Sequence, residues 1–308
     1  MILLCGIPSE SPLALVGEAL DRIGAPYRWF NQRHFEHTEM AFELDGTGLS
    51  GWLEMDGEGI ALDGVRGIYS RLMDHARLPE LKDEPPDSPL ARHCNALHDT
   101  LIRWTEISPA RVVNRIAAMG SNSSKPYQAQ LIREHGFEIP ASLITTDPHA
   151  VLAFREQHGR IIYKSISGVR SIVQTFDEKD LARLASVRWC PTQFQAYVPG
   201  TDVRVHVVGQ RVFATRIESD AVDYRYARSQ VGEAARLTAT ELGDELSQRC
   251  VDLTRALGLA FSGIDLRLTP DGRVFCFEVN PCPGYSYFEA NSGQPISLAV
   301  ANHLAWND

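Results

Sequence analysis

The sequence has no long apolar run. Its opening segment, residues 1–6, is too short for a signal peptide or a membrane span, and no later segment approaches roughly eighteen uninterrupted apolar residues. We therefore expect a cytoplasmic protein that has no membrane partner.

Paired cysteines and basic clusters are also missing. The six cysteines lie far apart without a CxxC pair, which argues against a zinc site and a disulfide framework and predicts reduced thiols. The net charge is −9 and the basic residues do not form runs, so an extended nucleic-acid footprint is disfavoured. Any bound polyanion should be small, and nucleic acid is not an expected partner.

What is present has the composition of a folded protein. The 308 residues are 44% hydrophobic and 22% charged, values close to the average for globular domains. We predict an α/β (α+β) fold with an N-terminal α/β domain over 1–110, a central unit over 111–190 and a C-terminal unit over 191–308.

The N-terminal part begins as strand, helix and strand. Short alternating apolar segments follow, separated by the dipeptides at 45–46, 56–57 and 63–64, each an Asp-Gly that predicts a hairpin turn in a β-ribbon. The proline-rich stretch 82–89 predicts an exposed loop.

Capping residues and periodicity predict the later elements. Ser124 and Pro126 favour a helix over 124–135, and Asp147 with Pro148 favours the start of another. The remaining predictions are strands at 141–145, 160–164, 172–176, 193–198, 203–208 and 211–219, a helix at 241–257, and a hairpin of 261–269 and 273–280.

That last hairpin carries two acids. If Asp271 and Gly272 form a two-residue loop, Asp265 lies directly opposite Glu278, with Asn280 on the same face. Directly opposed like charges are unfavourable unless something neutralises them, and oxygen ligands suit Mg²⁺.

The rest of that face is expected to be largely apolar, formed by Phe261, Val274 and Cys276. The alternative is a solvated hairpin whose acids pair with Arg267. We favour the metal, because Glu278 lies within an apolar strand, where an unpartnered charge is unfavourable.

At this hairpin the sequence resembles the ATP-grasp superfamily, and within it the RimK-type ligases. The segments Gly263-Ile264-Asp265-Leu266 and Phe277-Glu278-Val279-Asn280-Pro281 match the late Asp and Glu-x-Asn strands of those enzymes. The resemblance extends over about 112–304. It implies an ATP-grasp fold with a Rossmann-like N-terminal domain, a central lid subdomain and a C-terminal antiparallel-sheet subdomain, and it implies ATP and Mg²⁺ as cofactors.

The resemblance also assigns the nucleotide site. Lys125 and Lys164 would contact the phosphates, and Asp202 would take the ribose hydroxyls. The segment Gln195-Ala196-Tyr197-Val198 would read the adenine edge with backbone groups. A lone lysine is usually a solvated charge and a hinge-like strand usually belongs to a core, so the combined pattern carries these assignments.

Three arginines match the basic positions that hold the γ-phosphate and the acyl substrate, namely Arg204, Arg216 and Arg225. Guanidinium groups suit both because each ligand presents paired oxygens. The chain departs from the family in loop 165–171, which has one glycine where RimK-type proteins have several. Arg170 is our hypothesis for a compensating charge there. The usual Asn near Arg225 is also missing.

The N-terminal segment 65–71 and the preceding ribbon look like the leading domain of microviridin-type peptide ligases. The resemblance as a whole implies a ligase that converts a carboxylate to an acyl phosphate and passes it to an amine or other nucleophile, on a peptide or a small molecule. Alternatives are a kinase acting on a hydroxyl and a non-catalytic nucleotide-binding module. A homodimer remains open.

Other motifs are set aside. Segment 120–126 lacks the second glycine and the Ser/Thr of a Walker loop. Cys282, in a proline-flanked turn, is interpreted as structural. His93 and His98 have the wrong spacing for a pair on one helix face.

Overall fold

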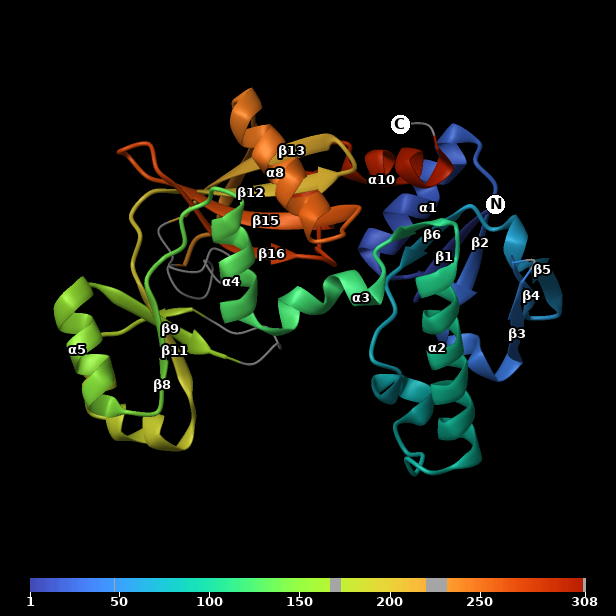
Figure 1. The fold of residues 1–308 in the computed structure, drawn as a ribbon, viewed down its shortest axis with the longest axis horizontal. Coiled ribbons are helices and arrows are strands. Elements are labelled where there is room, and N and C mark those ends of the chain that lie inside the picture. Colours follow the sequence, from blue (N-terminus) through green and yellow to red (C-terminus); the bar gives the residue numbers. More distant parts are fainter. Residues whose placement is uncertain (47, 167–172, 220–231, 307–308) are drawn as a thin grey trace.

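The structure is a computed structural model that describes residues 1–46, 48–166, 173–219 and 232–306. A first, four-stranded parallel sheet has the order β2-β1-β6-β7 and lies at the N-terminal end of the molecule (Figure 1). Its strands are β1 (Ile2–Gly6), β2 (Tyr27–Asn31), β6 (Gly67–Ser70) and β7 (Arg111–Val113), and its helices are α1 (Ser11–Ile23) and α2 (Pro89–Ile107).

The predicted β-ribbon is a separate antiparallel sheet of β3 (Thr38–Asp45), β4 (Gly48–Met55) and β5 (Glu58–Ala61). Its first two turns lie where the Asp-Gly dipeptides predict them. The third prediction is wrong, because Leu62–Gly64 forms a 3-10 turn, and the chain then leaves the ribbon to become β6 of the parallel sheet.

The central part of the chain contributes to two different units. After α3 (Ile116–Met119), helix α4 (Lys125–Glu134) packs against the C-terminal sheet. A four-stranded antiparallel unit follows, with α5 (Pro148–His158), α6 (Glu178–Leu181) and the order β10-β9-β11-β8. Its strands are β8 (Ser142–Thr145), β9 (Ile161–Ser165), β10 (Gln174–Thr175) and β11 (Thr192–Ala196). We refer to residues 142–196 as the lid unit.

The C-terminal part is a five-stranded antiparallel sheet with the order β14-β13-β12-β15-β16. Its strands are β12 (Thr201–Val208), β13 (Arg211–Glu218), β14 (Arg236–Thr240), β15 (Phe261–Leu268) and β16 (Val274–Asn280), and its helices are α8 (Asp244–Ala256), α9 (Ser286–Ser292) and α10 (Ile296–Ala305). Helices α8 and α4 cover one face, where Val203, Val205 and Val207 are buried.

The short 3-10 helices lie in the connections, at Gln32–His37, Leu62–Gly64, His75–Arg77, Pro79–Leu81, Gly120–Ser123 and Leu184–Trp189. Ser124 is the N-cap residue of α4, as predicted, but its side chain makes no capping hydrogen bond. Asp147 accepts from the His149 N–H at 2.9 Å, as predicted for α5, and Ser88 caps α2 by accepting from the Ala91 N–H at 3.1 Å.

The cores show which parts of the chain belong together. One core joins apolar residues of the first third, such as Leu13 and Leu20, to residues of the last third, such as Phe261 and Val300, and α10 packs against α1 (Figure 1). The lid unit has its own small core around Phe194 and Phe176. The first and last thirds of the chain therefore form one folded unit, which we call the base. The lid unit is joined to it by the connecting segments at its two ends.

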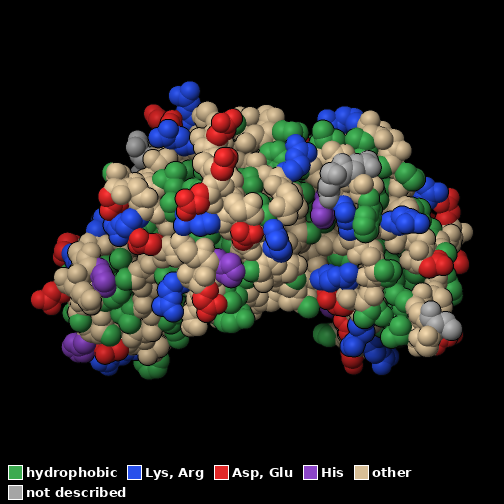
Figure 2. Space-filling model, turned by 45° about the horizontal axis from the view of Figure 1, so that its top comes forward, with side chains coloured by type: hydrophobic (Ala, Val, Ile, Leu, Met, Phe, Trp, Pro, Cys, Tyr) green, Lys and Arg blue, Asp and Glu red, His purple; other side chains and the backbone are tan. Residues whose placement is uncertain are grey.

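Within the described ranges, no helix has both the length and the apolar character that a membrane span requires. On the face drawn in Figure 2, basic and acidic side chains are interspersed.

Candidate functional site

The acidic hairpin places Asp265 opposite Glu278, as predicted, but its loop and register differ from the predicted ones. The Thr269 N–H donates to the Arg273 C=O at 3.0 Å, and Leu268 faces Val274, so the loop comprises Pro270, Asp271 and Gly272 rather than two residues. The register then shifts between Asp265 and Leu266. A β-bulge on β16 thus restores the pairing that the longer loop would have displaced.

The bulge corrects the expected composition of the carboxylate face. Cys276 faces Leu266, and together with Val274 it packs into the core under α8, on the opposite face from Asp265. Phe277 is the extra residue of the bulge, and its ring lies 5.2 Å from the guanidinium carbon of Arg267. An aromatic side chain therefore takes the place expected for Cys276.

Each carboxylate has a basic partner. Arg204 Nη1 lies 2.7 Å from Asp265 Oδ1, and Lys125 pairs with Glu278. Burial acts to raise the pKa of Glu278, but the positive charges of Lys125, Lys164 and Arg204 outweigh it and the pKa is lowered. Three of the predicted basic residues, from α4, β9 and β12, therefore converge on one carboxylate.

Helix α4 is fixed to β16 by a residue that the sequence analysis missed. The buried Gln128 side chain donates to the Val279 C=O at 2.8 Å and accepts from the Val279 N–H at 3.0 Å. Residues three apart lie on one face of a helix, so this contact brings Lys125 to Glu278, the neighbour of Val279. The sequence offered one signal for this contact, a glutamine about one helical turn after the predicted lysine.

Arg267 does not neutralise the hairpin acids, as the alternative interpretation required. Its Nε and Nη2 donate to the two oxygens of Asp202 at 2.7 and 2.8 Å, and its Nη1 donates to the Val198 C=O at 2.8 Å. The carboxylate predicted to take ribose hydroxyls is thus oriented by a bidentate pair.

The predicted hinge joins the lid unit to the base. The Ala196 N–H donates to the Ala141 C=O at 2.9 Å, the Tyr197 N–H donates to the Arg160 C=O at 3.0 Å, and Gln195 is buried. The Val198 C=O is held by Arg267, and Gln195 and Ala196 are also paired within the sheet of the lid unit. Adenine recognition would have to use other backbone groups of residues 195–198.

The register corrects the position expected for Arg216. It faces Val203 and shares the face of Ala214, under α8, whereas Arg204 faces Thr215 and lies on the other side of the sheet. Because side chains alternate along a strand, Arg216 is not brought to the carboxylates, and it lies 3.8 Å from Glu218 instead. Arg225 and Arg170 lie outside the described residues.

The oxygen groups fit a hard cation in kind. Asp265 and Glu278 face each other, and Asn280 lies one side-chain step along the same face, opposite Gly263. Asn280 Oδ1 accepts from the Cys282 N–H at 2.9 Å and retains a second lone pair. No group of three or more His, Cys, Asp or Glu suited to a metal occurs in the described part of the chain, so a metal here would depend on two carboxylates and an amide.

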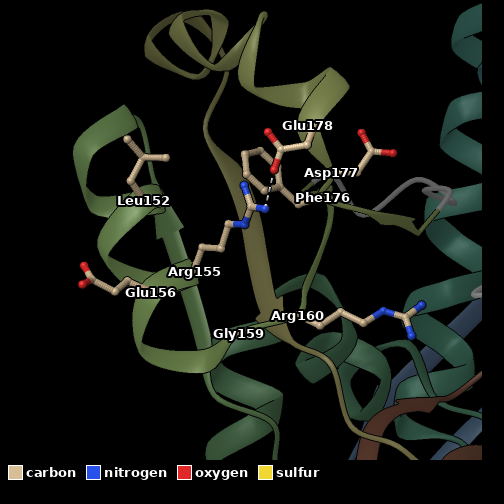
Figure 3. Close-up of a pocket in the computed structure, with 8 residues that line it drawn as sticks. All are labelled: Leu152, Arg155, Glu156, Gly159, Arg160, Phe176, Asp177 and Glu178. Atoms are coloured by element: carbon tan, nitrogen blue, oxygen red, sulfur yellow. Dashed lines mark hydrogen bonds and ion pairs between the residues drawn. The ribbon is translucent and has the colours of Figure 1, made fainter.

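The lid unit carries a hollow that is not lined by these residues. Its volume is about 580 Å³, and it is lined by residues of and next to α5 together with 176–178 (Figure 3). Arg155 crosses it to pair with Glu178 at 2.9 Å. None of its lining residues belongs to the predicted nucleotide or metal set.

A RimK-like ATP-grasp domain family matches residues 122–304. The chain is also 29% identical over 188 residues to a probable alpha-L-glutamate ligase of Histophilus somni, in an alignment that covers 57% of this chain and 60% of the relative. The chain thus spans about 60% of the length of that curated relative.

Several solved structures match almost the whole chain, among them the following two. The ATP-grasp ligase PsnB, complexed with a phosphomimetic variant of a minimal precursor, Mg and ADP, has a TM-score of 0.78 and 28% identity, covering 99% of this chain and 98% of that chain. The macrocyclase MdnC of Microcystis aeruginosa, bound with precursor peptide MdnA, has a TM-score of 0.80 at 22% identity and 99% coverage of each chain, and this similarity shows the fold alone.

Proposed function

The chain belongs to the RimK-like ATP-grasp domain family, and on that premise we propose that it is an ATP-dependent, ADP-forming ligase. It activates a carboxylate as an acyl phosphate and passes the acyl group to an amine or another nucleophile. A carboxylate resists direct attack because of its charge and resonance, so ATP must first convert it to a mixed anhydride, which then loses phosphate to the nucleophile.

One observation carries this proposal: Lys125, Lys164 and Arg204, from three different elements, converge on Glu278 beside Asp265. Phosphoryl transfer depends mainly on positioning and on neutralising charge. Asp265, Glu278 and Asn280 would hold Mg²⁺, which supplies positive charge to phosphate oxygens when bound. The three basic side chains would then bind and orient the phosphates, and the lid unit would exclude water from the acyl phosphate.

We propose a peptide as the carboxylate substrate. The supporting observation is that PsnB, whose structure is known in complex with the precursor peptide PsnA2, is 28% identical to this chain in an alignment that covers 99% of it, including the N-terminal domain. The probable glutamate ligase aligns with only 57% of the chain, which leaves an amino-acid-like small molecule as the second candidate. The six free cysteines fit the reducing cytoplasm, where we place the protein.

The test is a reaction of the purified chain with ATP, Mg²⁺ and short peptides that carry acidic and nucleophilic side chains. We expect release of inorganic phosphate and loss of one water from the peptide for each bond formed. Glu278→Gln should lower the rate of phosphate release by about 100-fold or more, since it removes a charge that positions phosphate-binding groups. Glu134→Gln, on the exposed part of α4, is the matched control and should keep the wild-type rate.

Other results would contradict the ligase function. Phosphate retained on the product would indicate a kinase, and binding of ATP without turnover by any substrate would indicate a non-catalytic module. Equal phosphate release by Glu278→Gln and wild type would remove this site from the chemistry.

A further inference from the structure

The guanidinium of Arg204 is confined within the protein. The residue is 5% exposed, its Nη1 lies 2.7 Å from Asp265 Oδ1, and its guanidinium carbon lies 5.7 Å from the centre of the Phe288 ring. A buried charge is tolerated only where its partners are closely arranged, so the groups around this side chain determine where it points.

Gly263 leaves the space in which the guanidinium lies. A Cβ at this position would be 2.2 Å from Arg204 Nη2, 2.7 Å from Arg204 Cζ and 2.8 Å from the Pro283 Cβ. The backbone of Gly263 does not have a positive φ, so a side chain is excluded here by space and not by conformation. The guanidinium therefore rests directly on the backbone of β15.

His206 lies two residues along β12, on the same face as Arg204 and opposite Gly263. It is fully buried, its ring is 5.0 Å from that of Phe288 and 6.2 Å from that of Phe261, and its Nε2 is 3.5 Å from Arg204 Nε. Burial, and then the charge of Arg204, hold the pKa of His206 well below its usual range. A neutral ring can present a lone pair to the guanidinium, whereas a protonated ring would repel it.

We propose that His206 and Gly263 are positioning residues for Arg204: the neutral imidazole accepts from Nε, and the absent side chain lets the guanidinium lie against the backbone of β15 while it pairs with Asp265. This inference rests on the proposed function for its kinetic consequence. In that function Arg204 acts on transferring phosphate, and a misplacement of about 1 Å can lower the rate about 100-fold. The orientation of Arg204, more than its presence, would then set the rate.

The kinetic test compares two replacements of His206. His206→Gln keeps an acceptor near the place of Nε2, whereas His206→Leu fills the volume without one. We expect His206→Leu to lower kcat about tenfold or more with KM for ATP changed less than about threefold, and His206→Gln to recover most of that loss. If His206 only fills the core, the leucine variant will equal or exceed the glutamine variant in kcat, which overturns the proposal.

Gly263→Ala gives a second kinetic test. We expect it to lower kcat about tenfold or more in the wild-type background and to cause little further loss in Arg204→Lys, which already lacks the planar group. Equal losses in the two backgrounds would show that the glycine does not act through the arginine. Thermal unfolding of each variant separates misfolding from mispositioning.

A readout without turnover separates this proposal from the proposed function. In the nitrogen NMR spectrum of the folded wild-type chain, His206 Nε2 should be unprotonated across neutral pH, and Arg204→Lys should shift its resonance. A proton on Nε2, or a resonance indifferent to Arg204→Lys, overturns the positioning role even if the chain is an active ligase. The expected spectrum from a chain without turnover would leave the positioning intact and contradict the ligase function.

Discussion

Lys125 determines the charge state of its partner. Burial is the largest single influence on the pKa of Glu278 and acts to raise it, and Lys125 provides the largest opposing influence. Because the pKa is lowered, the pairing stabilises the fold at pH values above the ordinary carboxyl pKa, and this stabilisation is lost as the pH falls through the lowered value.

Lys125→Met should therefore raise the pKa of Glu278. A pH titration of the side-chain carboxyl carbon by NMR, without magnesium, measures this directly. Lys82→Met, in the exposed loop before α2, is the control and should leave the titration unchanged. A pKa that stays low in Lys125→Met would show that Lys164 and Arg204 are sufficient.

The buried His206 predicts a second pH dependence of stability. Here it is the protonated form, and not the deprotonated form, that is charged and buried unfavourably. The folded chain resists protonation of this ring, whereas the unfolded chain protonates it near 6.5, so the free energy of unfolding should fall as the pH drops below that value. The slope from this one group approaches about 1.4 kcal/mol per pH unit.

His206→Leu should show a smaller slope by about that amount, measured by urea unfolding at several pH values between 7.5 and 5.0, a range of about two and a half units around the ordinary imidazole pKa. His149→Leu, on the exposed part of α5, removes a histidine that the fold does not bury and should keep the wild-type slope. Parallel curves for His206→Leu and wild type would mean that the folded chain admits a proton at His206.

At the residue scale, the sequence predicted charges better than their partners. Asp265 and Glu278 could be identified from the hairpin register and from the apolar strand around Glu278, whereas Lys125 and Arg204 were identified from the resemblance to ATP-grasp ligases. The hydrogen bonds of Gln128 with Val279 and of His206 with Arg204 could not be identified, since a glutamine or histidine in a helix or strand has no pattern that distinguishes a buried hydrogen bond from a solvated side chain.

The hairpin shows why pattern alone gives an uncertain register at the scale of elements. Asp271-Gly272 indicates a tight turn, but the hydrogen bonds of Thr269 lengthen the loop by one residue, and the bulge at Phe277 compensates. The positions of the paired acids and of Asn280 were predicted correctly, and those of Val274 and Cys276 were not. Loop length and bulges depend on packing against α8 and α4, which a two-residue turn signal does not contain.

The outer edge of β16 is an element-scale feature that the sequence did not reveal. As the last strand of its sheet, β16 has one backbone edge without a strand partner. The backbone of Glu138 covers part of this edge, because its C=O accepts from the Cys276 N–H at 2.9 Å and its N–H donates to the Val274 C=O at 3.0 Å. The side chain of Gln128 covers the part beside Val279. Gln128 lies on α4 and Glu138 lies shortly after it, so the position of α4 brings both residues to this edge.

Gln128→Leu should therefore destabilise the chain by about 2 to 4 kcal/mol, because it leaves the buried N–H and C=O of Val279 without partners. Chemical denaturation measures the loss. Gln130→Leu, on the exposed part of the same helix, should change stability by less than about 0.5 kcal/mol. Similar values for the two variants would mean that water replaces Gln128 at the strand edge.

At the scale of the whole molecule, the first and last thirds of the chain are joined by polar contacts as well as by their common core. Arg71, at the end of β6, binds Glu10 at 2.6 Å and donates to the Pro283 C=O at 3.1 Å. Burial acts to lower the pKa of Arg71, but the electrostatic influence of Tyr69 and then the hydrogen bond to Glu10 outweigh it, and the pKa is raised. The segment after the acidic hairpin is thus attached to the N-terminal domain.

The predicted division of the sequence into three consecutive units did not show that the first and last thirds of the chain share a core. Apolar positions of α1 and α10 indicate buried faces but not which helix covers which, and the boundary near residue 110 separated β7 from the sheet to which it belongs. The lid unit was easier to predict, because its elements are consecutive in sequence and bury one another.

Asn114, directly after β7, tests whether the base unfolds as one body. It is buried, its Nδ2 donates to the C=O groups of Phe261 and Pro281 at 2.6 Å each, and its Oδ1 accepts from the N–H groups of Ala260 and Phe261 at 2.8 and 3.1 Å. Removing these contacts should destabilise the base by about 2 to 4 kcal/mol. Because the core is shared, the loss should spread to strands on both sides of the contact.

Native-state hydrogen exchange of Asn114→Ala should therefore show faster exchange in β1 and β6 of the N-terminal sheet and, by the same free energy, in β12 and β15 of the C-terminal sheet. Amides of β9 and β11 should keep their wild-type rates, since the lid unit has a separate core. Asn291→Ala, on the exposed part of α9, is the control. Faster exchange confined to one of the two sheets would mean that each opens independently, and the first and last thirds of the chain would then not form one cooperative base.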